Sequence, residues 1–140
     1  MGKQKRRRMR MSSKTDYWLE MCDEDMLTAK VMLDAGRLLW MGFICHLIVE
    51  KSLKAVISER INEVPPKIHD LKSLAKRSDI MTDLSDGHLD LLEQLNPLQI
   101  EARYPEYKDR MSATLTPEIC RKIYCDTEGF LCWIKQQLGK

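Results

Sequence analysis

The sequence predicts an all-α fold, an up-and-down antiparallel four-helix bundle with a short additional helix. Apolar residues recur at alternating intervals of three and four along most of the chain, whereas no stretch shows the strict alternation of a half-buried strand. Short links join the helical stretches, which places consecutive helices side by side in opposite directions. A chain of 140 residues with 44% hydrophobic and 31% charged residues can bury the core of one globular domain.

The first predicted helix spans residues 16–35. Thr15 or Asp16 can cap its start by accepting hydrogen bonds from the first free amides. Gly36 can adopt the left-handed conformation that commonly ends a helix. The apolar residues lie on one stripe that can face the rest of the bundle: Leu19, Cys22, Met26, Ala29 and Leu33.

The second predicted helix spans residues 38–61, and Pro65 and Pro66 are expected to end it because proline cannot donate a helix hydrogen bond. Its first half is apolar on nearly every side, which predicts that it is the central helix of the core. The apolar run 38–49 has twelve residues, fewer than the roughly 20 that cross a bilayer. With no signal peptide either, we expect a cytoplasmic protein that does not enter a membrane.

Three further helices are predicted in the second half of the chain. A short one spans residues 69–78, and the next begins after Ser85, a good N-terminal cap. Asn96–Pro97 either kinks that helix or restarts it, and Pro105 ends it. The last helix starts at Thr116–Pro117, with threonine as cap and proline at the first helical position.

The formal net charge of +2 conceals an uneven distribution. Residues 1–14 contain seven basic residues and no acidic one, so residues 15–140 carry more acids than bases. Such a block could contact a phosphate backbone or an acidic partner, but short blocks of like charge are usually disordered. We therefore expect residues 1–14 to be a basic, disordered tail and residues 15–140 to be the helical-bundle domain.

The cysteines do not have the spacing of a metal site or a redox motif. Their number is odd and no C-x-x-C occurs, so we expect them to be small buried hydrophobic residues in a reducing compartment. They are Cys22, Cys45, Cys120, Cys125 and Cys132.

His46 and Glu50 place two ionisable groups on the apolar stripe of the second helix. Residues four apart are neighbours on a helix, so the two can pair with each other. Such a pair either fixes the register of a buried helix or serves acid–base chemistry or metal binding. A metal would need more ligands, and the only other histidines are His69 and His88, so we expect no metal site. The structural pair is the favoured interpretation.

The stretch RYPEY, Arg103 to Tyr107, combines an arginine with Tyr104 and Tyr107 at a predicted helix end. Arginine can bind phosphate with two hydrogen bonds, and tyrosines can stack on a base. A turn whose aromatic residues plug the bundle end, or a protein interface, explains the stretch equally well. Lys51 and Lys54 add a basic edge that a solvated helix face also explains.

His69, in the HDL stretch at a predicted helix start, is expected to cap or pack rather than to catalyse. Glycine-rich phosphate-binding motifs are absent: the sequence contains neither G-x-x-x-x-G-K-[ST] nor G-x-G-x-x-G. It also lacks H-E-x-x-H and a nucleophile elbow. If the protein binds a nucleotide, side chains in a groove must hold it.

Four stretches together resemble one family: DYWLEMCDEDMLTAKVML, FICHLIVEKSLKA, PPKIHDLKSLA and LNPLQIEARYPEYK. Over residues 16–138 the chain is similar to the HEPN domain (higher eukaryotes and prokaryotes nucleotide-binding domain). The resemblance implies an all-α homodimer that binds ATP, another nucleotide or RNA and needs no other cofactor. It also implies a minimal nucleotidyltransferase as partner, and many family members are ribonucleases or toxins.

The ribonuclease members of that family carry an arginine, four to six residues and then a histidine. Here eight residues separate Arg37 from His46, and eight separate Arg60 from His69. No histidine follows Arg103 within range. The resemblance therefore implies the branch without this motif, in which the domain binds a nucleotide or a partner and is not an enzyme.

We expect a dimeric nucleotide- or partner-binding companion of a minimal nucleotidyltransferase, in a toxin–antitoxin system. The alternatives are a metal-independent ribonuclease toxin, using Arg103 with a tyrosine or with His46 of a second subunit, and a purely structural dimerisation module. The ionic residues of the core, His46 and Glu50, are expected to share one groove with the Arg–Tyr corner, which is the RYPEY stretch from Arg103 to Tyr107. The candidate binding residues are Arg103, Tyr104, Tyr107, His46, Glu50, Lys51 and Lys54.

Overall fold

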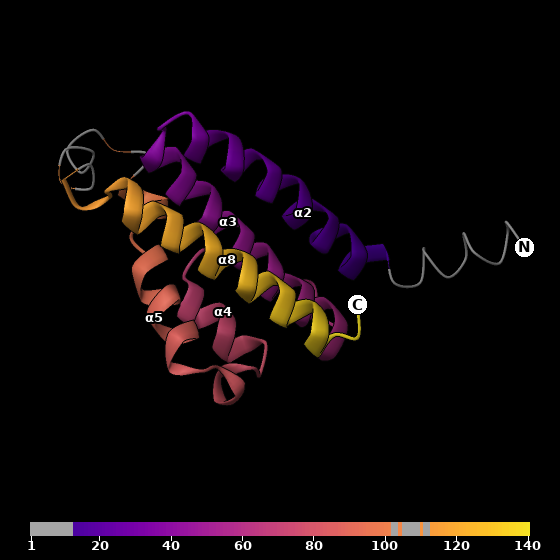
Figure 1. The fold of residues 1–140 in the computed structure, drawn as a ribbon. Coiled ribbons are helices and arrows are strands. Elements are labelled where there is room, and N and C mark those ends of the chain that lie inside the picture. The colour runs from indigo at the N-terminus through magenta and orange to yellow at the C-terminus, as the bar shows by residue number, and fades with distance from the viewer. Residues whose placement is uncertain (1–12, 102–103, 105–109, 111–112) are drawn as a thin grey trace, which may run out of the picture.

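The protein is described by a computed structural model that covers residues 13–101, 104, 110 and 113–140. In this part of the chain all regular secondary structure is helical, which confirms the all-α prediction (Figure 1). The predicted tail 1–14 lies, except for its last two residues, outside the described residues. The elements are α2 (Ser13–Asp34), α3 (Leu38–Val56), η1 (Ile57–Ile61), α4 (Leu71–Arg77), η2 (Met81–Asp83), α5 (Asp86–Leu95), α6 (Leu98–Glu101) and α8 (Pro117–Gln137).

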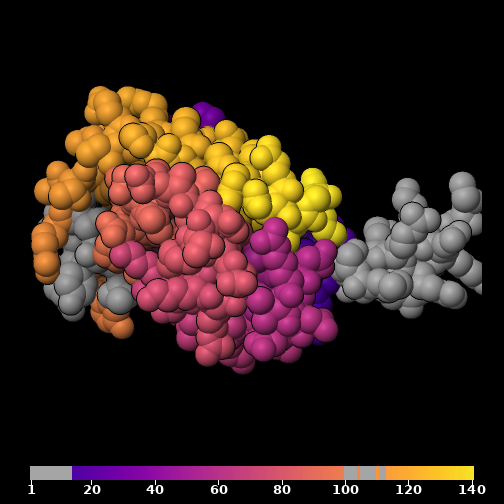
Figure 2. All heavy atoms as spheres, turned by 90° about the horizontal axis from the view of Figure 1, so that it is seen from below, coloured from indigo at the N-terminus to yellow at the C-terminus, as the bar shows by residue number. Residues whose placement is uncertain are grey.

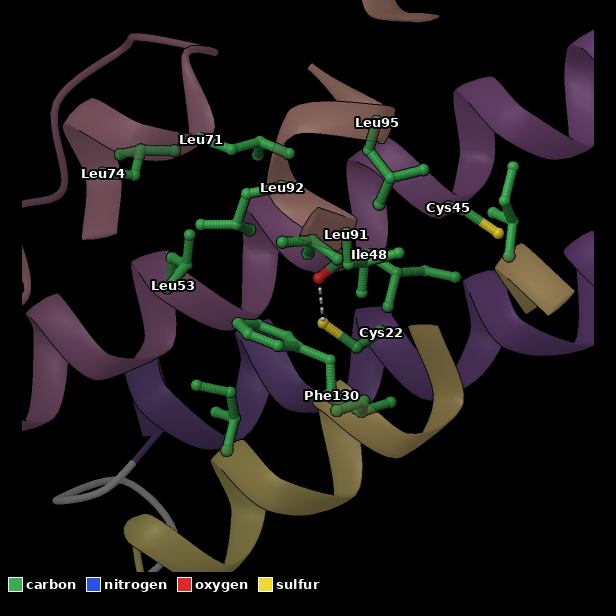
Figure 3. Close-up of a cluster of buried hydrophobic side chains, with 14 of the residues drawn as sticks. Cys22, Cys45, Ile48, Leu53, Leu71, Leu74, Leu91, Leu92, Leu95 and Phe130 are labelled. Atoms are coloured by element: carbon green, nitrogen blue, oxygen red, sulfur yellow. Dashed lines mark hydrogen bonds between the residues drawn. The ribbon is translucent and has the colours of Figure 1, made fainter. Parts of the chain in front are cut away.

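Helix α3 lies at the centre of the bundle, as its apolar composition predicts. It packs against α2 and α8, and the shorter helices α4, α5 and α6 cover another side of it (Figure 1). Helix α2 runs antiparallel to α3, whereas α8 runs in the same direction as α3 because the α4–α5 segment returns the chain to the other end. The shared core includes Cys22 from α2, Ile48 from α3, Leu91 from α5 and Phe130 from α8 (Figure 3).

The cysteines divide into a buried and an exposed group. Cys22, Cys45 and Cys120 are buried, and the thiol of Cys22 donates a hydrogen bond to the carbonyl of Ile48 at 3.4 Å (Figure 3). Cys125 and Cys132 are exposed on α8, so the prediction of buried cysteines is wrong for these two. The reason is the stripe of α8: its core positions include Cys120 and Phe130, and neither exposed cysteine lies on that face.

Gly36 ends α2 as the sequence predicts. Its φ is +74°, its amide donates to Leu33 O at 3.1 Å, and the amide of Arg37 donates to Met32 O at 2.8 Å. This is the Schellman arrangement, in which a left-handed residue lets two amides satisfy the last free carbonyls. The start of α2 differs from the prediction, because Thr15 lies inside the helix. Its hydroxyl donates to Glu59 at 3.2 Å.

The helical stretch that contains the central helix ends at residue 61, as predicted, but the cause of the stop differs from the prediction. After Val56 the chain makes a π-helical turn, η1, which stops at Asn62 in the left-handed conformation with φ 56°. Asparagine tolerates this conformation better than most residues, so the helix ends before it reaches Pro65 and Pro66. Asn62 therefore ends the helix, and the two prolines do not. A longer segment, residues 62–70, then leads to α4.

The C-terminal end of the chain is held against the start of α2 and against η1. The guanidinium of Arg60 in η1 donates to the carbonyl of Gln137 at 2.8 Å, and Lys140 forms an ion pair with Asp16 at 3.1 Å. The end of α8 therefore lies beside both the start of α2 and the end of α3 (Figure 1). Among the described residues no helix is long and apolar enough to cross a membrane.

The N-terminal caps of three helices come from local sequence. Ser85 caps α5 and Thr116 caps α8, with Pro117 at the first helical position, as predicted. Helix α4 starts at Leu71 with Asp70 as its cap, where the side chain accepts from the Ser73 amide. His69 was expected to cap or pack at this helix start; the cap is Asp70, and the His69 side chain is free to contact other elements.

Candidate functional site

Glu50 lies at the centre of a buried ionic cluster on α3. Its side chain is 6% exposed, and its Oε2 accepts a hydrogen bond from Lys54 Nζ at 2.9 Å. The Nδ1 atom of His69 lies 3.1 Å from both carboxylate oxygens. One carboxylate therefore joins two turns of α3 to the segment that precedes α4.

The predicted pairing of His46 with Glu50 is only partly realised. His46 Nδ1 lies 3.6 Å from Glu50 Oε1, too far for a hydrogen bond, because the carboxylate turns towards Lys54 and His69. The imidazole is completely buried, and neither ring nitrogen has a hydrogen-bond partner among the described residues. Burial lowers the pKa of His46 to about 4, although Glu50 opposes the shift, so this histidine is neutral near pH 7.

Lys54 is buried, with 7% of its surface exposed. Its ammonium lies between the Glu50 carboxylate and the ring of Trp18, whose centroid is 5.8 Å away. Both neighbours attract a positive charge, since the face of an aromatic ring is negative. The interpretation of Lys54 as part of a solvated helix face is therefore wrong. Its charge is used within the subunit.

Lys51 points to a different neighbour. Its Nζ lies 2.6 Å from Asp25 Oδ2 of α2, and both side chains are about one-fifth exposed. This pair joins α2 to α3. Lys51 therefore lies apart from the Glu50 cluster, although the two residues are adjacent in the sequence.

His69 and its neighbours connect this cluster to an open cleft. The amide Nδ2 of Asn96 donates to Asp70 at 2.6 Å, and its Oδ1 accepts from the Leu71 amide at 3.0 Å. The end of α5 is thereby fixed to the start of α4. The hydrogen bonds from Asn96 and Ser73 hold the pKa of Asp70 below its usual range.

The cleft has a volume of about 460 Å³, within the range of small-molecule sites. One side is formed by His69, Asp70 and Lys72, and the other by residues at the end of α5 and in α6: Glu93, Asn96, Pro97 and Gln99. Figure 2 shows the face of the molecule on which α4 and α5 lie, with α8 along one edge. The residues that line the cleft therefore all follow the central helix in the sequence, and the helices α4, α5 and α6 pack against that helix.

The Arg–Tyr corner is only partly visible. Arg103 and Tyr107 lie outside the described residues, and Tyr104 is half-exposed. The expectation that they share a groove with the Glu50 cluster stays a prediction. Arg103 follows Gln99, a residue of the cleft, by four positions in the sequence.

The structure adds residues that sequence reasoning did not select: Asn96, Gln99 and the cleft-facing role of His69. A local signal existed for two of them, because HDL and NP both stand at helix boundaries, where side chains are free to contact other elements. Gln99 carried no such signal. Within the described part of the chain, no group of three or more His, Cys, Asp or Glu residues could hold a metal ion.

The fold and the cleft define a small helical bundle with an open cleft beside its central helix. Comparison with protein families matches residues 15–137 to the HEPN domain. The chain therefore belongs to the HEPN domain family, whose members are of nucleotide-binding or ribonuclease type. Searches of curated proteins and of solved structures return no match.

Proposed function

We propose that this HEPN protein is a non-catalytic, dimeric companion of a minimal nucleotidyltransferase in the cytoplasm, with a toxin–antitoxin role and a nucleotide as ligand. Family membership supports a nucleotide-related role. The observation that carries the non-catalytic part is the burial of His46, whose imidazole is inaccessible and neutral near pH 7. The Arg-x4–6-His pattern of ribonuclease members is also absent from the sequence.

The outer face of α2 supports the proposed dimer. Tyr17, Leu27 and Val31 are 60–67% exposed, and Leu27 and Val31 lie one helical turn apart. Exposed apolar residues grouped on one face are typical of interaction surfaces. We assign this face to a second copy of the chain.

Co-expression with a minimal nucleotidyltransferase from the same genome tests the proposal. The two proteins should elute together from a sizing column, and the chain alone should elute as a dimer. Leu27→Asp should shift the chain alone to the monomer position, whereas Gln94→Asp, at an exposed position of α5, serves as a control that should leave the dimer intact. Separate elution of the two proteins at micromolar concentration would refute the companion role.

A second candidate is metal-independent cleavage of RNA. It is favoured by His69, whose ring is 48% exposed and held by the Glu50 carboxylate, an arrangement that orients a general base. Structured RNA incubated with wild-type protein, His69→Ala and Arg103→Ala in the presence of EDTA separates the two functions. We expect no cleavage; cleavage by wild type that either variant abolishes would replace the companion by an enzyme.

A further inference from the structure

A second cleft lies between α5 and α8 and has a volume of about 350 Å³. It is lined by α5 with its N-terminal cap, over residues 85–94, and by α8 over residues 122–130. At a rise of about 1.5 Å per residue, these stretches make the cleft about 12 Å long. It shares no residue with the cleft beside His69, so it is a separate candidate site.

The floor of the α5–α8 cleft is apolar. It includes the buried side chains of Leu91 and Phe130, and the ring of His88 packs edge-on against Phe130 with centroids 5.2 Å apart. Burial lowers the pKa of His88 below its ordinary value, so the imidazole is neutral near pH 7. The floor can therefore cover methylene groups, and it adds no positive charge to the cleft.

The rim of the cleft carries unbalanced negative charge. Asp90 of α5 and Asp126 of α8 both line it, and Lys122 Nζ lies 2.5 Å from Asp126 Oδ2. Within the described part of the chain, no hydrogen bond or ion pair occupies the Asp90 carboxylate. Residues 78–101 contain no lysine or arginine, so the segment around Asp90 offers no counter-ion. Two carboxylates against one ammonium leave one negative charge on the rim.

Lys122 indicates which charge the cleft attracts. The pKa of its ammonium is raised, mainly through the hydrogen bond and the charge of Asp126 and in smaller part through the charge of Asp90. Both carboxylates therefore act on a cation at the same rim. An anion would meet like charge here, whereas a second ammonium would find the carboxylate of Asp90 without an ion-pair partner.

We propose that the α5–α8 cleft binds a linear aliphatic polyamine. One of its ammonium groups pairs with Asp90, another lies beside Asp126, and the methylene chain between them covers the apolar floor. The length of the cleft suits an extended chain, whereas a single metal ion would leave the apolar floor in contact with water. This assignment does not rest on the proposed role as companion of a nucleotidyltransferase.

The exposed thiols of α8 report on the occupancy of this cleft. Cys125 lines it, whereas Cys132, two helical turns further along α8, does not. Iodoacetamide is uncharged, so its rate of reaction with each thiol of the full chain, followed by mass spectrometry, does not depend on attraction of the reagent. About 0.15 M salt screens diffuse attraction of the ligand. Spermidine at about ten times its Kd should then slow the labelling of Cys125 about tenfold and leave Cys132 unchanged.

Lysine side chains of a protein carry the same ammonium groups, so a blocked trilysine peptide of equal charge serves as the second ligand. Spermidine should protect Cys125 at the lower concentration, because its ammonium groups lie on one chain that fits along the cleft. Protection by trilysine at the lower concentration would overturn the polyamine assignment and identify a protein segment as the ligand.

Asp90→Asn removes the carboxylate that has no ion-pair partner. It should raise the spermidine concentration needed for protection about fivefold, the upper end for an exposed ion pair. Asp83→Asn is the matched control, because Asp83 is an exposed acid of the same segment that does not line the cleft.

Gly129→Leu tests the space of the cleft without changing its charge. Gly129 lines the cleft, and a Cβ at this position finds open space within 4 Å. Leucine is also a better helix former than glycine, so the variant should fold, fill the cleft and abolish the protection of Cys125 by spermidine. Thermal unfolding of each variant verifies the fold.

Three results would overturn the inference. The first is equal slowing of Cys125 and Cys132, which indicates diffuse attraction, and the second is no slowing of Cys125 at about 10 mM spermidine. The third is unchanged protection in either Asp90→Asn or Gly129→Leu. Elution with a nucleotidyltransferase is a separate measurement, so failure of this assignment is distinguishable from failure of the proposed function.

Discussion

Replacing Glu50 with Gln should destabilise the fold strongly, because Glu50 neutralises a buried lysine. Glu50 is 4% exposed and Lys54 7%, and their charged atoms lie 2.9 Å apart. Removing one partner of a buried ion pair costs about 3–5 kcal/mol, since the other charge stays buried and uncompensated. The glutamine oxygen still accepts one hydrogen bond, so we expect the lower end: about 3 kcal/mol, or a fall in Tm on the order of 10 °C.

Urea unfolding followed by circular dichroism measures the effect for Glu50→Gln, Lys54→Met and the double variant. The double variant has no unpaired ammonium, and methionine fills the volume of the lysine stem, so most of the lost stability should return. Lys30→Gln is the matched control. Lys30 and Asp34 have the same spacing and the same 2.9 Å separation, but they are exposed, so the unfolding midpoint should not change.

A loss of less than about 1 kcal/mol in Glu50→Gln, with an unchanged m value, would refute this reasoning, because it is the size expected of an exposed pair. Strict additivity of the two single substitutions would refute it equally. Additivity would mean that the two side chains do not stabilise each other despite their contact.

Three further predictions concern a histidine, the thiols and an asparagine. Burial holds the pKa of His46 at about 4, below its unfolded value of about 6.5, so protonation favours the unfolded chain. The contribution of neutral His46 to the free energy of unfolding is fully present above pH 6.5 and is lost as the pH falls towards 4. His46→Leu should reduce this loss, as measured by urea unfolding at several pH values. An equal loss of stability in wild type and variant would contradict the assignment. A thiol-reactive dye should label the exposed Cys125 and Cys132 in the native protein, and the three buried thiols only after unfolding. Burial raises the pKa of Cys22 and Cys45 to about 12 and that of Cys120 to about 11, so these thiols are unreactive in the folded chain. Native labelling of more than two thiols would be inconsistent with this fold. Asn96→Ala should lower the free energy of unfolding by about 1–2 kcal/mol, because it detaches α5 from the start of α4. An unchanged unfolding midpoint in urea would mean that Asn96 does not hold the two elements together.

Local chemistry made most helix boundaries predictable. Ser85, Thr116 and Gly36 act within three or four residues of their own position, so the sequence alone shows both the residue and its partner. The predicted end of the central helix at residue 61 agrees with the structure, but the cause of that end was not predictable. Asn62 and the π-helical turn before it end the helix earlier than the double proline, and a turn of this kind has no clear sequence signature.

The sequence predicted some residues of the candidate site, but it did not predict which of them contact one another. The position of Glu50 on the apolar stripe correctly indicates a buried acid, since the stripe of the central helix faces the core. Spacing offers His46 and Lys54, each four residues away, as equal partners. The structure selects Lys54, and it adds His69, nineteen residues further along the chain.

The sequence by itself determined the all-α class, the central helix and the presence of ionic residues within it, because these properties follow from periodicity and from contacts over three or four residues. Only the tertiary structure decided that His46 stays neutral and unpaired, that Lys54 is buried between Glu50 and Trp18, and that His69 and Gln99 face one cleft. The physical reason is that a charged or polar side chain takes the partner that lies nearest in the folded chain. That partner comes from whichever elements the packing of the core brings together.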